Sequence, residues 1–114
     1  MANALPNRES LLLEHCRADA RKMDEGVLDL VLKQLDGWTR AGDAITRSYK
    51  FADYFHTMAF VNAVASVAHR EDHHPDLAVF YNRCDVTFST HSAGGVTRND
   101  LICAVHVDAL QVPA

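Results

Sequence analysis

The chain has 114 residues, of which 48% are hydrophobic, so it can build the core of one domain but is too short for two. Its formal net charge is -4 and no basic stripe is present, which argues against direct nucleic-acid binding. Its three cysteines are unevenly spaced and include no Cys-x-x-Cys pair, so a reducing compartment such as the cytoplasm fits better than a disulfide framework.

The first 20 residues are expected to form an N-terminal extension beside a single domain at residues 21–114. Three leucines at positions 11–13 predict a short peripheral helix that continues through Cys16. The start of the chain contains Arg8 and Glu9 and lacks a long apolar run, so we do not expect a signal peptide. No segment approaches the roughly 20 apolar residues of a membrane span.

The first firm element is a helix at residues 24–35. Its apolar residues fall at helical spacing, and they are Val27, Leu28, Val31, Leu32 and Leu35. Asp24 suits the positive N-terminal end of the helix, and Gly37 is a typical C-terminal stop. These signals define both ends of the helix.

A hairpin follows, with strands at residues 38–40 and 44–51 and a turn at residues 41–43. In the second strand Ile45 and Tyr49 share one face, while the alternate positions are polar. Arg47 interrupts the apolar face, because it falls where the alternation calls for an apolar side chain.

The strongest helix is predicted at residues 52–71, and it carries two apolar stripes. One contains Tyr54, Met58, Val61, Ala65 and Ala68, and the other contains Phe60, Val64 and Val67. One stripe is enough to dock a helix on a sheet, so two stripes predict that a second subunit covers the other side. Pro75 keeps His74 out of the helical conformation and therefore ends the helix.

Strands at residues 77–81 and 86–90 and a last helix from Thr97 to near Pro113 complete the pattern. Thr97 and Asp100 have the spacing of a capping box. The order α-β-β-α-β-β-α predicts an α+β fold with a four-stranded antiparallel sheet and helices packed on one face. In this scheme His91 shares the polar face of the second strand.

The candidate site combines His73 and His74, at the end of the long helix, with His91. Histidine exchanges protons near neutral pH, so such a group is a candidate for proton transfer. Two alternatives remain open on the residues alone. A metal site could add His69, one helical turn before His73, although the carboxylates nearby lack a recognised metal spacing. The histidines could also simply cap the helix and hydrogen-bond the loop.

The order of these residues resembles the pterin-4a-carbinolamine dehydratases, also known as dimerisation cofactor of a hepatocyte transcription factor. The resemblance covers roughly residues 24–112. It rests on Gly37-Trp38, Tyr49-Lys50-Phe51-Ala52-Asp53, Asp72-His73-His74-Pro75-Asp76, Tyr81-Asn82-Arg83, Ser89-Thr90-His91, and Gly95-Val96-Thr97 with Asp100. The combination of His-His-Pro, Tyr-Asn-basic and Thr-His at the family's spacing is specific.

The resemblance implies a hydro-lyase that converts 4a-hydroxytetrahydrobiopterin to the quinonoid dihydropterin and water, a step of tetrahydrobiopterin recycling. It implies no cofactor and no metal, and a homodimer or homotetramer built around helix 52–71. His73, His74 and His91 take the place of the family's catalytic histidines. The substrate-binding residues that it implies are Asp72, His73, His74, Ser89, Thr90, His91 and Ser92. Biopterin, monapterin and molybdopterin-related pterins all remain open as substrates.

The resemblance also carries an alternative, because the same fold in animals stabilises a transcription-factor dimer. A non-catalytic binding or regulatory protein is therefore the second hypothesis. Two positions depart from the family pattern near the site. Leu77 stands where many members have an aromatic residue, and His69 stands where the residue is often acidic.

Overall fold

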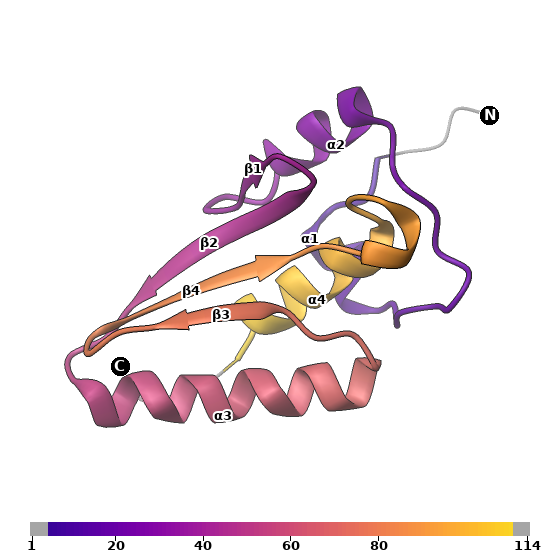
Figure 1. Cartoon of the computed structure of the whole chain (residues 1–114). Helices are drawn as coiled ribbons and strands as arrows, with labels where there is room; N and C mark the ends of the chain where they lie inside the picture. The colour runs from indigo at the N-terminus through magenta and orange to yellow at the C-terminus, as the bar shows by residue number, and fades with distance from the viewer. Residues whose placement is uncertain (1–4, 111–114) are drawn as a thin grey trace.

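The structure, a computed structural model, describes residues 5–110 and has the element order α-α-β-β-α-β-β-α (Figure 1). The elements are α1 (Arg8–Leu12), α2 (Glu25–Leu32), β1 (Thr39–Ala41), β2 (Ala44–Lys50), α3 (Tyr54–Glu71), β3 (Asp76–Val79), β4 (Arg83–Phe88), a 3₁₀ turn (His91–Ala93) and α4 (Arg98–Asp108). The strands form one antiparallel sheet in the order β1-β2-β4-β3. This confirms the predicted fold class.

Several predicted boundaries are wrong. The helix α1 ends at Leu12 and does not reach Cys16. The strand β4 begins at Arg83 and ends at Phe88, so His91 lies on the 3₁₀ turn rather than on the polar face of the strand. The last helix ends at Asp108, and Pro113 lies outside the described residues.

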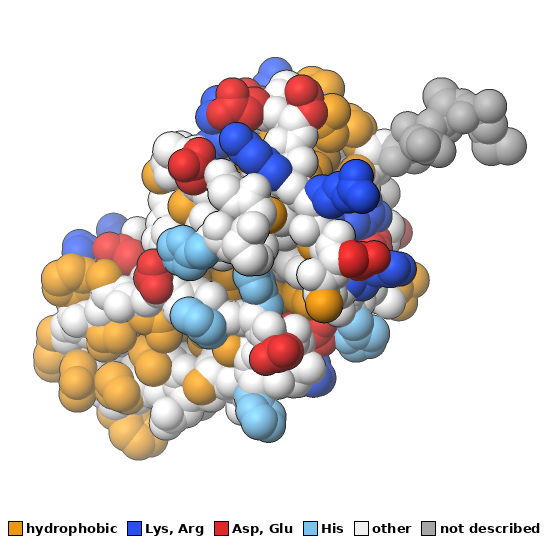
Figure 2. Space-filling model, turned by 45° about the vertical axis from the view of Figure 1, so that its right-hand side comes forward, with side chains coloured by type: hydrophobic (Ala, Val, Ile, Leu, Met, Phe, Trp, Pro, Cys, Tyr) orange, Lys and Arg blue, Asp and Glu red, His pale blue; other side chains and the backbone are white. Residues whose placement is uncertain are grey.

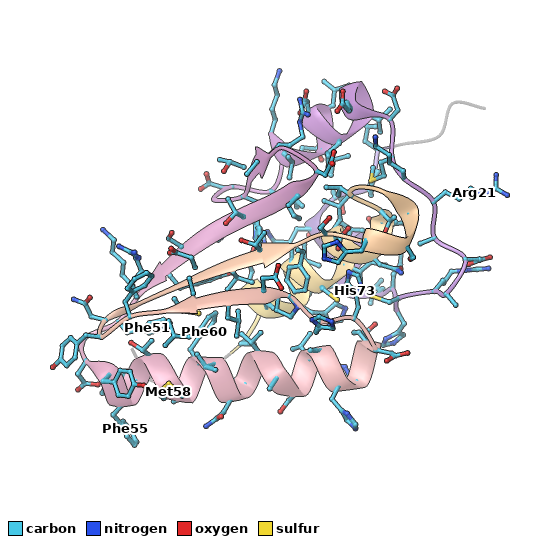
Figure 3. The ribbon with its side chains drawn as sticks, viewed as in Figure 1. Arg21, Phe51, Phe55, Met58, Phe60 and His73 are labelled. Carbon is cyan, nitrogen blue, oxygen red and sulfur yellow. The ribbon has the colours of Figure 1, made fainter. Side chains whose placement is uncertain are left out.

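The core lies between the sheet and the two helices α3 and α4, which cover the same face (Figure 1). The strand β4 contributes Cys84, Val86 and Phe88, whose exposed fractions are 1% or less. The stripe of α3 that contains Phe60, Val64 and Val67 packs inward, with at most 2% of each residue exposed (Figure 3). Of the other stripe, Tyr54 and Ala65 are exposed, whereas Val61 is partly buried and packs against the core.

Arg47 interrupts the apolar face of β2 because its side chain donates a hydrogen bond to a buried carboxylate. Asp108, at the end of α4, accepts hydrogen bonds from Arg47 at 3.1 Å, from the Trp38 indole at 2.9 Å and from Arg8 at 2.6 Å. The Tyr49 hydroxyl also donates to Asp108. Several donors thus satisfy one carboxylate and join α1, the first hairpin and α4.

The N-terminal segment packs on the domain, contrary to its predicted peripheral place. Leu11 on α1 is fully buried, and α1 contacts α4. The chain then passes around the end of the molecule that holds the 3₁₀ turn (Figure 1). The boundary at residue 20 stays a prediction. Among residues 5–110, none of the helices combines the length and the apolar character that a membrane crossing needs.

Candidate active site

The end of α3 turns sharply and presents the first group of site residues. Asp72 caps the helix in the left-handed conformation, with φ 52° and ψ 42°. This turn places the backbone N–H of His73 3.1 Å from the carbonyl of Ala68, in the manner of a helix C-cap. His73 and His74 follow, and the helix ends ahead of Pro75 as predicted.

The second group comes from the loop after β4. Because β3 and β4 are antiparallel neighbours, the start of β3 lies beside the end of β4, with Asp76 paired to Thr87. The two groups meet there and enclose a hollow of about 260 Å³. Its lining consists of Asp72, His73, His74, Ser89, Thr90, His91 and Ser92. The residues that the resemblance implied for substrate binding thus all line one hollow.

His73 is held by a buried carboxylate, Asp100. The His73 Nε2 atom lies 2.5 Å from Asp100 Oδ1, and Asp100 is completely buried while the His73 side chain is 14% exposed. The other carboxylate oxygen accepts hydrogen bonds from the Thr90 hydroxyl at 2.8 Å and from the Thr97 backbone N–H at 2.9 Å. The ring of His73 also stacks on Phe88, with 6.0 Å between centroids.

This network fixes which nitrogen of His73 carries a proton toward Asp100. An ionised carboxylate only accepts hydrogen bonds, so Nε2 of His73 donates and Nδ1 remains to exchange a proton. The Thr90 hydroxyl donates its one hydrogen bond to Asp100. It can therefore accept a hydrogen bond from the Thr97 hydroxyl, 2.8 Å away. Asp100 thus orients the ring.

The other two histidines of the hollow are more open. His74 and His91 are exposed, and His74 Nδ1 lies 3.4 Å from the carbonyl of Pro75. Such rings can turn toward a ligand, whereas His73 is fixed. The hollow therefore combines one anchored histidine with two adaptable ones.

Sequence reasoning missed the role of Asp100 toward His73. Its capping-box spacing predicted a structural cap, and the cap is present, since Asp100 accepts from the Thr97 N–H. The same carboxylate has a second oxygen, which reaches His73. Sequence spacing carries no signal for that contact, because α3 and α4 meet only in the folded chain.

Several histidines lie outside the hollow. His69 is exposed on α3 and does not line it. His15 contacts Glu71, His56 contacts Asp53, and His106 contacts the carbonyl of Glu14. Within residues 5–110, no three histidine, cysteine or acidic side chains come together as metal ligands.

Comparison with known proteins decides the family. The model of the family described as pterin 4 alpha carbinolamine dehydratase matches residues 21–110. The chain belongs to this family. A Xanthomonas oryzae protein, provisionally named a pterin-4-alpha-carbinolamine dehydratase, is 49% identical over 106 residues, which cover 91% of this chain and 89% of the relative.

Solved structures agree with the family. A crystal structure from Brucella melitensis, titled transcriptional coactivator/pterin dehydratase, is 40% identical with a TM-score of 0.74, and the match covers 78% of this chain and 97% of that one. A pterin dehydratase-like protein described as a RuBisCO assembly factor is 20% identical with a TM-score of 0.52, over 63% of this chain and 83% of that one. This second likeness shows the fold alone.

Proposed function

We propose that this member of the pterin-4a-carbinolamine dehydratase family removes water from a 4a-hydroxytetrahydropterin by histidine acid–base catalysis. One observation carries the proposal: His73, His74 and His91 line a single hollow, and His73 is anchored to the buried Asp100. The family match and the names of the relatives supply the reaction class.

The reaction needs two proton transfers. The C4a–O bond breaks as its oxygen takes a proton and leaves as water, while the N5–H proton is lost and the N5–C4a double bond forms. At the start of the reaction the group that acts as the acid must be protonated and the group that acts as the base must be neutral. At the end the acid has lost its proton and the base has gained one. Histidines suit both tasks near neutral pH, each contributing roughly 10²–10⁴ in rate.

We assign the two transfers to His73 and His91, and the orientation of the pterin to His74. Asp100 holds the His73 imidazole in one orientation through its hydrogen bond, as a buried carboxylate does beside a catalytic imidazole. Asp72, Ser89, Thr90 and Ser92, which line the same hollow, would bind the pterin. The reaction itself requires no metal or organic cofactor.

The test is a stopped-flow absorbance assay with enzymatically generated carbinolamine. Replacing His73 or His91 by Ala should lower kcat by roughly 10²-fold or more, because a proton-transfer group is lost. A matched control is His56→Ala, which removes a histidine at the far end of α3. Near-normal turnover of a site variant would remove that histidine from the mechanism.

A folded protein without turnover would leave the non-catalytic binding role as the better hypothesis. The unmodified chain decides this before any variant is made. Its turnover must exceed spontaneous dehydration of the carbinolamine under the same conditions.

We also propose that the chain forms a homodimer or homotetramer through α3. Large apolar side chains gather where α3 begins and β3 ends (Figure 2): Tyr54 is 52% exposed, Phe55 74%, Phe80 45% and Tyr81 64%. Phe55 points away from the sheet (Figure 3). Soluble monomers rarely expose contiguous apolar patches of this kind. This supports the proposal that a second copy of the chain covers the patch.

A further inference from the structure

Two thiols meet where the N-terminal segment crosses α4. Cys16 lies on the segment between α1 and α2, Cys103 lies on α4, and their Sγ atoms are 3.5 Å apart although 87 positions separate them in the chain. Both are free cysteines. A disulfide bond measures roughly 2.05 Å, so the two sulfurs have only about 1.5 Å left to close. The fold thus places two distant cysteines in contact.

The backbone on the Cys16 side can supply this small movement. Cys103 is completely buried in the middle of α4, whereas Cys16 is half-buried in a stretch without regular secondary structure. Hydrogen bonds from the Cys16 N–H to Glu71, at 2.8 Å, and from the Arg17 N–H to the side chain of Asn99, at 2.9 Å, hold this stretch in place. The thiols therefore stay close together without a covalent bond.

A small oxidant can reach one of the two sulfurs from solvent. Cys16 lines a cavity of about 240 Å³, whose wall also contains the exposed residues Arg17, Asp72 and Ser92. Cys103 does not line this cavity. Its hydrogen bond with the Cys16 sulfur and its burial both raise the pKa of the Cys103 thiol. Since the thiolate is the form that attacks an oxidant, Cys16 is the cysteine that reacts first.

We propose that Cys16 and Cys103 form a reversible disulfide when the protein meets a peroxide, and that this bond fastens the N-terminal segment to α4. The inference is independent of the proposed function, because it rests on the two sulfurs and their surroundings. In a reducing compartment the pair stays in the thiol form, and the disulfides that form there are commonly transient and redox-sensing.

The oxidation proceeds in two steps, with hydrogen peroxide as the oxidant. The Cys16 thiolate attacks one peroxide oxygen; the O–O bond breaks, an S–O bond forms, and the other oxygen leaves as hydroxide, which takes a proton and becomes water. The Cys103 sulfur then attacks the Cys16 sulfenic acid; an S–S bond forms, the S–O bond breaks, and the leaving oxygen takes the Cys103 proton and departs as a second water. The two thiols lose two electrons in total, and the peroxide gains them.

The bond would have a measurable effect on stability. It would close a loop over residues 16–103, which is most of the chain, and a long closed loop lowers the entropy of the unfolded state. We expect the oxidised protein to melt about 10 °C or more above the reduced protein. Cys103 Sγ also lies 3.9 Å from the carbonyl of His73, so the cross-link would sit beside the backbone of a candidate site residue.

The test exposes the reduced, full-length protein to a small excess of hydrogen peroxide and analyses it under denaturing, non-reducing conditions. Free thiols should fall from three to one per chain, and the intact mass should fall by the mass of two hydrogen atoms. Dithiothreitol should restore both values. Cys16→Ser should prevent the oxidation of Cys103. Cys84→Ala is the matched control, because it removes the buried cysteine of β4 that lies outside the pair, and it should still form the disulfide.

Peptide mapping of the oxidised, unmodified chain identifies the linked cysteines directly, so the test does not depend on the folding of any variant. Three results would overturn the inference: a disulfide that includes Cys84 or joins two chains, three thiols that all survive the peroxide, or a sulfinic acid at Cys16 beside a free Cys103. A cross-linked protein whose melting temperature does not rise would overturn the claim that the bond fastens the N-terminal segment.

Discussion

Asp100 shows how a single residue can meet a local and a distant requirement with two oxygens. One oxygen accepts from the Thr97 N–H and caps α4, which its spacing in the sequence predicts. The other reaches His73, 27 positions earlier in the chain. The histidines could be predicted because their residue type and order carry the chemistry. Their anchor could not, because the contact exists only through tertiary packing.

Asp100→Asn should separate these two duties. The amide oxygen can still accept from Thr97, but an amide N–H directed at His73 would make Nε2 the acceptor and select the wrong tautomer. We expect kcat to fall by roughly 10²-fold or more, with an altered pH profile of kcat. Rapid kinetics across pH, with a thermal melt as the control for folding, measures this. An Asn variant with normal kcat would show that the anchor is only structural.

The histidine chemistry also predicts that metal removal has no effect. If His73 and His91 transfer both protons, as proposed, the dehydration needs no metal, so activity should survive dialysis against EDTA. Elemental analysis should find no stoichiometric zinc in the active protein. Activity that is lost on chelation and restored by zinc would favour the metal alternative instead.

At the scale of elements, hydrophobic periodicity predicted the sheet and its helices, and it failed where polar residues carry the packing. Arg47 breaks the pattern of β2 because Asp108 lies beneath it. The sequence predicts a peripheral place for the N-terminal segment. It is nevertheless held by side chains from α3 and α4, including Glu71 and Asn99. No local sequence pattern predicts that these side chains contact the N-terminal segment.

Glu71 should make the packing of the N-terminal segment sensitive to acid. Burial alone raises the pKa of Glu71, but hydrogen bonds from His15, the Cys16 backbone and Arg70 outweigh burial and lower the pKa from 4.5 to about 2. The folded state thus binds the proton more weakly than the unfolded chain. The stabilisation that the ionised Glu71 carboxylate gives the fold is complete above pH 4.5 and is lost as the pH falls toward 2.

Urea unfolding of the unmodified chain and of Glu71→Gln tests this. The Gln variant should be less stable near neutral pH, and the difference between the two proteins should shrink as the pH falls from about 4.5 to 2. Asp19→Asn is the surface control, because Asp19 is exposed and, among the described residues, its carboxylate forms an ion pair with its neighbour Arg17. A constant difference across this range would contradict the assigned role of Glu71.

At the scale of the whole molecule, the apolar surface of α3 is the feature that the isolated chain leaves unexplained. The sequence predicted two stripes without showing which one faces the sheet. The structure places Phe60, Val64 and Val67 inside, so a charge at Val64 would enter the core and would not test an interface. The outward stripe contains Tyr54 and Ala65, both exposed.

Neighbouring positions on α3 therefore give a matched pair of variants. Ala65→Glu places a charge on the outward stripe and should split the oligomer into folded monomers, because the partner's apolar surface cannot solvate it. Val64→Glu places the same charge in the core and should unfold the subunit, at a cost of several kcal/mol for an unpaired buried charge. Light scattering with circular dichroism distinguishes the two outcomes. An unmodified protein that is monomeric at micromolar concentration would refute the interface, and Phe55 and its neighbours would then be exposed in the working form.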